Sequence, residues 1–397
     1  MSRATIPAER YRSRLERAQQ ELPGHDAAAM LIGVGADLEW LIGYAAMPLE
    51  RLTMLVVPAE GRATLVVPRL EVAAAETSPG VGGGLVELVS WQETEDPFSL
   101  VAELLQRTGS RPEIQLGALG GTWGRLGGLL ISDHLWATFL LRIQAAVPDA
   151  AFGLASSALA ELRAIKDADE IELLRRAAHA ADRVIAAMAA GRLVGRSESD
   201  LAREVRNRLL DEGHEQATGS IVGSGPNSAS PHHDASDRLV AAGEPIVFDI
   251  GGRIEGYTSD ITRTLWVSGP DGSPPAAEYR ALYDVLQRAQ AAATAAVRPG
   301  VGCEEIDQLA RQIIADAGYG EQFIHRTGHG IGLEVHEEPY IVEGNDEPLA
   351  VGHAFSVEPG IYLAGRYGAR IEDIVVCAAD GPDVLNQAPR ELLIASG

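Results

Sequence analysis

The segment Pro245-Ile-Val-Phe-Asp249-Ile-Gly-Gly-Arg-Ile-Glu-Gly-Tyr-Thr-Ser-Asp260-Ile-Thr-Arg-Thr264 predicts an apolar strand that runs into an acid, then a glycine-containing loop and a second strand. If the loop is centred between Ile254 and Glu255, Asp249 and Asp260 face each other across a hairpin, with Cβ atoms about 5 Å apart. Two carboxylates that close repel each other, and a buried unpaired carboxylate is costly or stays protonated. A divalent cation between them removes both problems, so the hairpin predicts a metal site.

A second stretch near the C-terminus has the same form. The run Phe355-Ser-Val-Glu358 leads into a glycine-rich loop, which is followed by Arg370-Ile-Glu372-Asp. If this loop is centred on Gly365, Glu358 and Glu372 also face each other across a hairpin. Acids on ordinary amphipathic strands explain either hairpin alone equally well, and a bulge would change either register. Two hairpins of the same form in one domain favour a shared metal site.

A nitrogen ligand is available in Thr327-Gly-His329-Gly-Ile-Gly, because a backbone of glycines can approach a ligand closely. A lone histidine is more often a core residue than a ligand, but His325 and His336 lie nearby in the sequence and favour the ligand interpretation. An oxygen-rich set with one imidazole suits Mn²⁺, Co²⁺ or Zn²⁺.

The chain has 397 residues, which predicts two domains. We expect an α/β (α+β) protein with an N-terminal domain over residues 1–160 and a C-terminal domain over residues 161–397, joined near Leu162–Lys166. The glycine run Gly80–Gly84 lacks a nucleotide-binding context and predicts a loop. Apolar periodicity predicts strands at Ala28–Val34, Met54–Pro58 and Thr64–Pro68, and helices at Pro97–Arg107, Asp167–Ala190, Glu198–Glu212, Ala276–Ala296 and Cys303–Ala317.

The composition limits the kinds of partner that we expect for this protein. Apolar residues make up 46% and charged residues 22%, as in an ordinary globular protein, and the net charge is −23. A chain this acidic repels nucleic acid and anionic membrane surfaces, so neither is an expected partner. The two cysteines, Cys303 and Cys377, are too few for a disulfide framework and are expected to be buried thiols. With no signal peptide or membrane span in the sequence, the expected location is cytoplasmic.

At these motifs the sequence resembles the Xaa-Pro aminopeptidase and prolidase family, which shares the pita-bread fold with methionine aminopeptidases. The resemblance covers the whole C-terminal domain strongly, and the N-terminal, creatinase-like domain by size and pattern only. The matching stretches are Asp249–Thr264, the block from Thr327 through His336 to Glu-Glu-Pro, Val357-Glu-Pro-Gly, Arg370-Ile-Glu372-Asp, Pro231-His232-His233 and Leu162–Lys166.

The resemblance implies a function for each matched residue. It implies two divalent metal ions, with Asp260 and Glu372 bridging them, and a homodimer. A metal-activated water then attacks the carbonyl before proline in a dipeptide or short peptide, and Glu358 carries a proton to the leaving nitrogen. The implied metal ligands are Asp249, Asp260, His329, Glu358 and Glu372; the implied catalytic residues are His232, His336, Glu358 and Arg370; the implied substrate-binding residues are His232, His325 and His336.

Some alternatives stay open. Dipeptide-specific prolidases can hold the substrate carboxylate with an arginine between the catalytic His and Glu, and none lies between His336 and Glu358. Arg51, Arg366 or an arginine of a partner subunit could substitute, so dipeptidase and aminopeptidase specificity are both open. A creatinase-like or lyase-like enzyme with a non-peptide substrate, or a non-enzymatic binding module, are the competing interpretations. Retention of all five ligands argues against both, and the large N-terminal half disfavours a methionine aminopeptidase.

Overall fold

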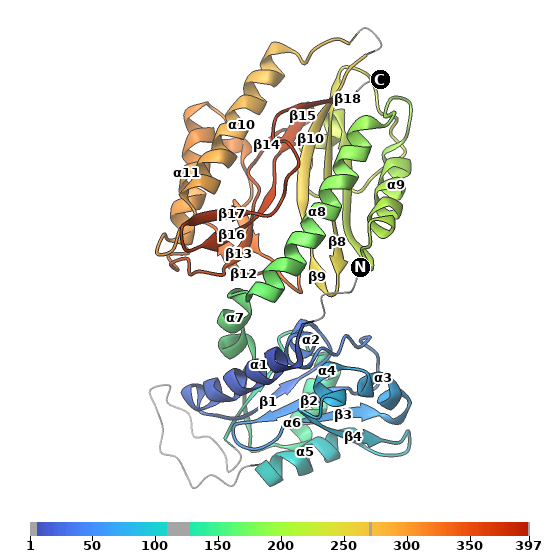
Figure 1. Cartoon of the computed structure of the whole chain (residues 1–397), viewed down its shortest axis with the longest axis vertical. Helices are drawn as coiled ribbons and strands as arrows, with labels where there is room; N and C mark the ends of the chain where they lie inside the picture. Colours follow the sequence, from blue (N-terminus) through green and yellow to red (C-terminus); the bar gives the residue numbers. More distant parts are fainter. Residues whose placement is uncertain (1–5, 109–126, 270–271, 396–397) are drawn as a thin grey trace. The chain divides into compact units, whose positions relative to one another are not determined.

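The computed structural model describes residues 6–108, 127–269 and 272–395, and the chain divides into two compact units (Figure 1). The first unit ends at Arg163 and the second begins at Ala164. Each unit combines helices with β-sheets, which confirms the predicted fold class. Among the described residues, no helix has the length and apolar character needed to cross a membrane.

A six-stranded sheet forms the centre of the first unit, in the order β4-β3-β2-β1-β5-β6. Strand β1 pairs antiparallel with β2 and parallel with β5. Apolar side chains of the sheet, such as Leu31 and Val56, pack with Phe98 and Leu105 of α5. The strands are β1 (Ala27–Ile32), β2 (Met54–Pro58), β3 (Thr64–Pro68), β4 (Glu87–Trp91), β5 (Gly128–Ile131) and β6 (Ala151–Leu154), and the helices are α1 (Ala8–Glu21), η1 (Leu22–His25), α2 (Ala36–Ile42), η2 (Arg69–Glu71), α3 (Val72–Glu76), α4 (Pro79–Gly82), α5 (Pro97–Thr108), α6 (Ala137–Ala146) and α7 (Ser156–Ala164).

The predicted elements of this unit are confirmed with one exception. The three predicted strands correspond to β1, β2 and β3, and the predicted helix corresponds to α5. The loop predicted at Gly80–Gly84 is wrong in part, because Pro79–Gly82 form the short helix α4. Pro79 stands near the start of this helix, where its fixed φ suits the helical backbone and its missing N–H has no partner to lose.

The second unit contains two successive halves, each with two helices followed by strands. The first half contributes a sheet in the order β18-β10-β8-β7, with β9 paired to β8. Figure 1 shows its helices α8 and α9, in green, alongside this sheet. The elements are α8 (Ala168–Ala190), α9 (Glu198–Asp211), β7 (Gln216–Ser224), η3 (Gly225–Ala229), β8 (Glu244–Ile254), β9 (Tyr257–Thr258), β10 (Ile261–Val267) and, from the end of the chain, β18 (Leu393–Ala395).

The second half contributes a sheet in the order β12-β11-β13-β16-β17 and the two-stranded sheet β14-β15. Helices α10 and α11, in orange in Figure 1, pack against these strands through one apolar cluster that includes Leu286, Ile306, Phe355 and Val375. The elements are α10 (Ala277–Ala296), α11 (Cys303–Asp316), η4 (Gly320–Gln322), β11 (Gly328–Gly330), β12 (Glu337–Ile341), β13 (Ala354–Val357), β14 (Gly360–Leu363), β15 (Tyr367–Arg370), β16 (Asp373–Ala378) and β17 (Gly381–Val384).

Local sequence explains where the long helix α8 begins. The Asp167 side chain accepts hydrogen bonds from the backbone N–H groups of Asp169 and Glu170, and Glu170 accepts one from the Asp167 N–H in return. This capping box satisfies N–H groups that have no partner within the helix. All four helices predicted in this unit are confirmed to within a residue or two at their ends. Both cysteines, Cys303 and Cys377, are free and buried, as predicted.

The register predicted for the first acidic hairpin is wrong. Asp249 lies opposite Thr262 and not opposite Asp260. The turn consists of Glu255 and Gly256, whose φ angles are 49° and 85°. Two positive φ angles are what a two-residue type I′ hairpin turn requires. This turn moves the centre of the loop one position towards the C-terminus, which shifts the partner of Asp249 by two residues.

The register predicted for the second hairpin is confirmed. Val357 pairs with Asp373 on one side of the acids, and Gly360 pairs with Arg370 on the other. Both pairings are centred on Gly365, so Glu358 stands opposite Glu372. The two residues lie in the break between the sheet β13-β16 and the sheet β14-β15, where neither takes part in a regular ladder.

A buried ion pair joins the two halves of the second unit. Arg263 on β10 donates to Asp373 on β16 at 2.6 Å, and both side chains are fully buried. The guanidinium also donates to backbone carbonyls, including those of Glu372 at 2.6 Å and Pro389 at 2.8 Å. Since its donors are all directed at acceptors, the buried charge is both neutralised and hydrogen-bonded.

We predict that Arg263→Met lowers the free energy of unfolding by about 3–5 kcal/mol, because among the described residues it leaves only Arg390 paired with the buried Asp373 and leaves the carbonyls of Glu372 and Pro389 without their donor. Chemical denaturation at pH 7 measures the change. The matched control is Arg203→Met, which removes an exposed ion pair to Asp200 and is expected to cost at most about 1 kcal/mol. Equal effects of the two substitutions would contradict the importance of the buried pair.

Candidate metal centre

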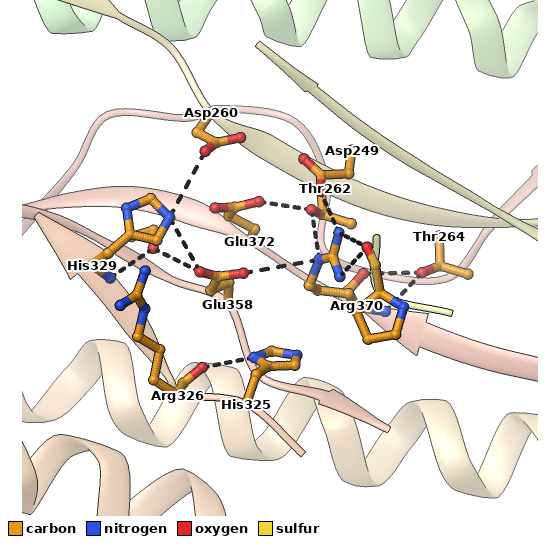
Figure 2. A network of polar contacts seen from close by, with 12 residues as sticks. Asp249, Asp260, Thr262, Thr264, His325, Arg326, His329, Glu358, Arg370 and Glu372 are labelled. Carbon is orange, nitrogen blue, oxygen red and sulfur yellow. Dashed lines mark hydrogen bonds and ion pairs between the residues drawn. The ribbon is translucent and has the colours of Figure 1, made fainter. Parts of the chain in front are cut away.

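The five predicted metal ligands lie on one cavity of about 730 Å³ in the second unit. Ligand atoms of Asp260, His329 and Glu372 all lie within 4.8 Å of one another. Glu358 Oε1 is 3.2 Å from His329 Nε2, and Asp249 accepts a hydrogen bond from Arg370 beside them. Figure 2 shows the acids and the imidazole pointing toward a common space. The structure therefore brings together every residue that was predicted to bind metal.

Each half of the unit supplies two acids to this space. Asp249 lies on β8 and Asp260 immediately precedes β10, whereas Glu358 and Glu372 lie in the break of the second hairpin. His329 lies on the short strand β11, which runs between β12 and β13. The site is thus formed where the two sheets face each other.

The glycines on either side of His329 allow the neighbouring strands to pack closely against β11. A Cβ atom at Gly328 would collide with the carbonyl oxygen of Ser356, and one at Gly330 would collide with the backbone of Glu338. The glycines therefore let β12 and β13 approach β11 on both sides, a role additional to the ligand approach expected from the sequence. The Ser356 hydroxyl accepts a hydrogen bond from the His329 N–H at 3.1 Å and fixes the strand further.

Hydrogen bonding also determines how the His329 ring is used. Its Nδ1 lies 3.1 Å from the Gly330 carbonyl oxygen, which can only accept, so Nδ1 carries the proton in this contact. Nε2 is left facing Glu358 at 3.2 Å and Asp260 at 3.9 Å. Burial acts to lower the pKa of His329, but the hydrogen bond to Glu358 outweighs it and raises that pKa, so Nε2 holds a proton more readily than usual. Once that proton leaves, the ring presents its Nε2 lone pair to the same space, as a metal ligand must.

The electrostatics of the acids favour a cation. Burial, followed by the charge of Asp249, raises the pKa of Asp260 well above its usual value. Burial and the charge of Asp260 do the same for Glu372. Burial also acts to raise the pKa of Glu358, but the hydrogen bond from His329 outweighs it and lowers that pKa to about 2. The acids compete for too little positive charge, and the donor set fits hard or borderline divalent ions.

Arg370 supplies part of that charge and is fully engaged. Its guanidinium donates to Asp249, to Thr262 Oγ1 at 3.1 Å and to the Tyr362 hydroxyl at 2.9 Å. Thr262 in turn donates to Glu372 at 2.7 Å. Arg370 and Thr262 therefore connect an acid of the first hairpin to an acid of the second (Figure 2).

The three predicted substrate histidines all line the cavity. His325 Nδ1 donates to the Arg326 carbonyl at 2.7 Å, so its Nε2 accepts from the Tyr362 hydroxyl at 2.9 Å. The His336 ring packs edge-on against His329, with centroids 4.2 Å apart. Burial and the adjacent His329 lower the pKa of His336, which keeps it neutral at pH 7. His232 follows Pro231 in the loop after η3 and is among the residues that line the cavity.

Sequence reasoning missed a residue that anchors the His232 loop. Glu198, at the first turn of α9, is fully buried. Its carboxylate accepts hydrogen bonds from the Ser224 N–H at 2.7 Å, from Asn227, from His233 Nε2 at 2.8 Å and from the Ser236 hydroxyl at 2.7 Å. These donors stand before and after His232. Acids are common at the first turn of helices because they interact favourably with the helix dipole, so the sequence does not distinguish Glu198. The only sequence signal for this loop is Pro231-His232-His233.

Hydrogen bonding controls the ionisation of Glu198. Burial acts to raise its pKa, but the hydrogen bonds from Ser236, His233 and Ser224 outweigh burial and lower the pKa to about 2. Because this value lies below the usual 4.5, the ionised carboxylate stabilises the fold at neutral pH. That stabilisation is lost as the pH falls from about 4.5 towards 2.

This geometry defines a metal-dependent hydrolase with a separate N-terminal α/β domain. Residues 172–379 match the model of metallopeptidase family M24, and residues 14–165 match the creatinase/prolidase N-terminal domain. The chain belongs to metallopeptidase family M24, and the predicted family resemblance is confirmed. Membership of this family implies bound divalent metal ions.

Solved structures of similar proteins agree over nearly the whole chain. Dipeptidase PepE from Mycobacterium ulcerans is 42% identical, with a TM-score of 0.88 over 99% of this chain and 100% of that one. A prolidase from Thermococcus sibiricus is 35% identical, with a TM-score of 0.86 over 98% and 100%. An Xaa-Pro dipeptidase from Bacillus anthracis is 28% identical, with a TM-score of 0.84 over 97% and 99%.

We predict that Asp260→Ala and Glu372→Ala abolish binding of divalent metal, because both acids lie in the cluster with His329. His232→Ala should keep the metal and lose kcat, because His232 lines the cavity outside that cluster. Elemental analysis after dialysis, beside kcat, measures both effects. Loss of metal from the His232 variant would refute this division of roles.

We predict that Glu198→Gln lowers the free energy of unfolding of the metal-free protein by about 2–4 kcal/mol at pH 7. The difference from the parent should shrink between pH 4.5 and pH 2, where the parent carboxylate takes up a proton. Urea denaturation at a series of pH values measures it. Asp200→Asn, at an exposed position of the same helix, is the control, and a difference independent of pH would contradict the assignment.

Proposed function

We propose that the protein hydrolyses the Xaa-Pro bond of dipeptides or short peptides with two divalent metal ions, Mn²⁺, Co²⁺ or Zn²⁺. Asp249, Asp260, His329, Glu358 and Glu372 would hold the ions, with Asp260 and Glu372 shared between them as the family resemblance implies. The observation that carries the proposal is the convergence of these five residues on one cavity that three histidines also line. The names of the similar structures, a dipeptidase, a prolidase and an Xaa-Pro dipeptidase, support the substrate class.

When bound, the ions supply Lewis-acid activation of a water and of the scissile carbonyl. The chain's own residues perform the remaining tasks. Glu358 accepts a proton from the attacking water and passes it to the leaving proline nitrogen. Its Oε1 lies 3.2 Å from His329 and its Oε2 lies 4.0 Å from Arg370, so its orientation is held from two sides.

The histidines act on the substrate. His336, which is neutral, and His232 can each donate an N–H to the carbonyl oxygen, on which negative charge develops in the transition state. His325 is held by Tyr362 and orients the peptide. Burial raises the pKa of Tyr362 to about 12, so its hydroxyl keeps its proton and the chain of donors from Arg370 through Tyr362 to His325 stays intact at neutral pH.

The non-peptide alternative finds no support in the similar structures named above, which are dipeptidases and a prolidase. All five ligand positions are occupied by side chains able to bind metal, which also argues against a binding module without activity. A homodimer, a cytoplasmic location and the identity of the native metal stay predictions.

Proline specificity has a physical basis in the rigidity of the ring, whose φ is fixed near −65°. A pocket shaped to the ring gains contacts without ordering a flexible residue, and an apolar group of this size is worth about 1–3 kcal/mol in transition-state discrimination. We therefore predict that kcat/KM for Ala-Pro exceeds that for Ala-Ala by about ten- to two-hundred-fold.

Matched assays at equal metal loading measure this preference. Chelation should abolish activity, and Mn²⁺ or Co²⁺ should restore it. Equal kcat/KM values for Ala-Pro and Ala-Ala would remove proline specificity but leave metal-dependent hydrolysis. Full activity of protein shown to contain no metal would overturn the proposed function, and activity on creatine alone would support the non-peptide alternative.

A further inference from the structure

A second arginine lines the same cavity and differs from Arg370 in having no acidic partner. Among the described residues, no ion pair or side-chain hydrogen bond involves the guanidinium of Arg326. Its one recorded contact is with the face of the Tyr340 ring, 4.3 Å from the ring centroid. Figure 2 shows the Arg326 side chain directed toward the acids and His329. An arginine lining a cavity with its five donors uncommitted is suited to bind an anion.

The backbone that carries Arg326 is fixed on both sides. Asp307 of α11 accepts hydrogen bonds from the N–H and the hydroxyl of Thr327, at 3.0 and 2.8 Å. Arg311, one helical turn further along α11, donates to the carbonyl of His325 at 3.0 Å. The residues before and after Arg326 are therefore tied to the same helix, and the side chain starts from a fixed point.

The Tyr340 ring restricts the side chain as well. Tyr340 lies on β12 directly opposite His329 in the ladder. A guanidinium stacked on an aromatic face keeps its in-plane donors free, because the interaction uses the face of the group and not its edge. The stacking therefore orders the side chain without using the N–H groups that recognise a carboxylate.

Arg326 is also the cation of the cavity lining that remains free to bind an anion. Of the residues that line the cavity, the arginines are Arg326 and Arg370, and lysine is absent from this lining. Arg370 is committed to Asp249, Thr262 and Tyr362.

We propose that Arg326 binds the C-terminal carboxylate of the substrate and so makes the enzyme a dipeptidase. This inference rests on the proposed function. In an Xaa-Pro dipeptide the carboxylate carbon is three bonds from the scissile carbonyl carbon, within about 4 Å. A dipeptide with its carbonyl at the metal ligands therefore needs a cation on the wall beside them. Arg326 precedes His329 by three residues and meets that need with a bidentate contact.

The position answers a question that the sequence left open. No arginine lies between His336 and Glu358. Of the substitutes considered within this chain, Arg366 is exposed and pairs with Glu278 at 2.9 Å. Arg51 of the first unit pairs with Glu50 and Glu93. Arg326 lies three residues before His329, and the sequence motifs assign roles to its neighbours His325 and His329 but not to Arg326 itself.

The test compares Ala-Pro with its amide, Ala-Pro-NH₂, which keeps the scissile bond and lacks the carboxylate charge. The parent, fully loaded with Mn²⁺, should prefer Ala-Pro by about tenfold or more in kcat/KM, as a charge-assisted hydrogen bond implies. Arg326→Gln should raise KM for Ala-Pro by about 10- to 100-fold, change kcat less, and leave KM for the amide little changed. Arg326→Lys should give a KM for Ala-Pro between those of the parent and Arg326→Gln, because lysine keeps the positive charge but cannot make the bidentate contact of a guanidinium.

Arg366→Gln is the matched control and should behave as the parent on both substrates, since this exposed arginine is not among the residues lining the cavity. Metal content and the melting temperature check that each variant is folded and loaded. Equal losses on Ala-Pro and its amide in the Arg326 variant, or a parent that cleaves both equally well, would overturn the proposal. A parent that cleaves neither would instead overturn the proposed function.

Discussion

The second unit depends on one constraint: acids that are buried close together need compensating positive charge. The fold meets this constraint twice with arginine. Arg263, together with Arg390, neutralises Asp373 between the two sheets, and Arg370 pairs with Asp249. Arginine suits both places because its charge is permanent and its planar fork satisfies several acceptors at once. In the described part of the chain neither Asp260 nor Glu372 has an arginine partner, and burial followed by the neighbouring carboxylates raises the pKa of each. This shortage of positive charge, more than any single motif, marks the candidate metal centre.

The architecture explains why the acids converge. Two similar halves each place a pair of helices outside a sheet, and each half directs one acidic hairpin inward. The second hairpin carries Glu358 and Glu372 where the strands leave one sheet for another, so neither acid is committed to a ladder. Thr262, which the first hairpin places opposite Asp249, then hydrogen-bonds Glu372 of the second hairpin. The metal centre is therefore continuous with the contacts that hold the halves together, and the precision of one depends on the stability of the other.

Much of this could be predicted from the sequence, and the failures have physical causes. Periodicity located the long helices and the strands β2 and β3, because amphipathic patterns and β-branched runs are local properties. The register of the second hairpin could be predicted by centring its glycine-rich loop on Gly365. For the first hairpin the turn could be centred at either of two adjacent positions, and these give different partners for Asp249. Glu255 at positive φ decided that choice, and a glutamate there is not what propensity suggests. Contacts between distant segments, such as Glu198 with His233, carry no local pattern and were not predicted.

Protons and metal ions compete for the same atoms in this site. In the metal-free protein the hydrogen bond from His329 stabilises the ionised form of Glu358, while Asp260 and Glu372 favour the protonated form. A metal ion requires the opposite state of Asp260 and Glu372, and it requires the Nε2 lone pair of His329. Binding must therefore release protons and rearrange the contact between His329 and Glu358. The Nδ1 contact to the Gly330 carbonyl survives this change, because it uses the other side of the ring. The protein thus keeps the imidazole oriented in both states, while Asp260, Glu372 and Nε2 of His329 give up protons when metal binds.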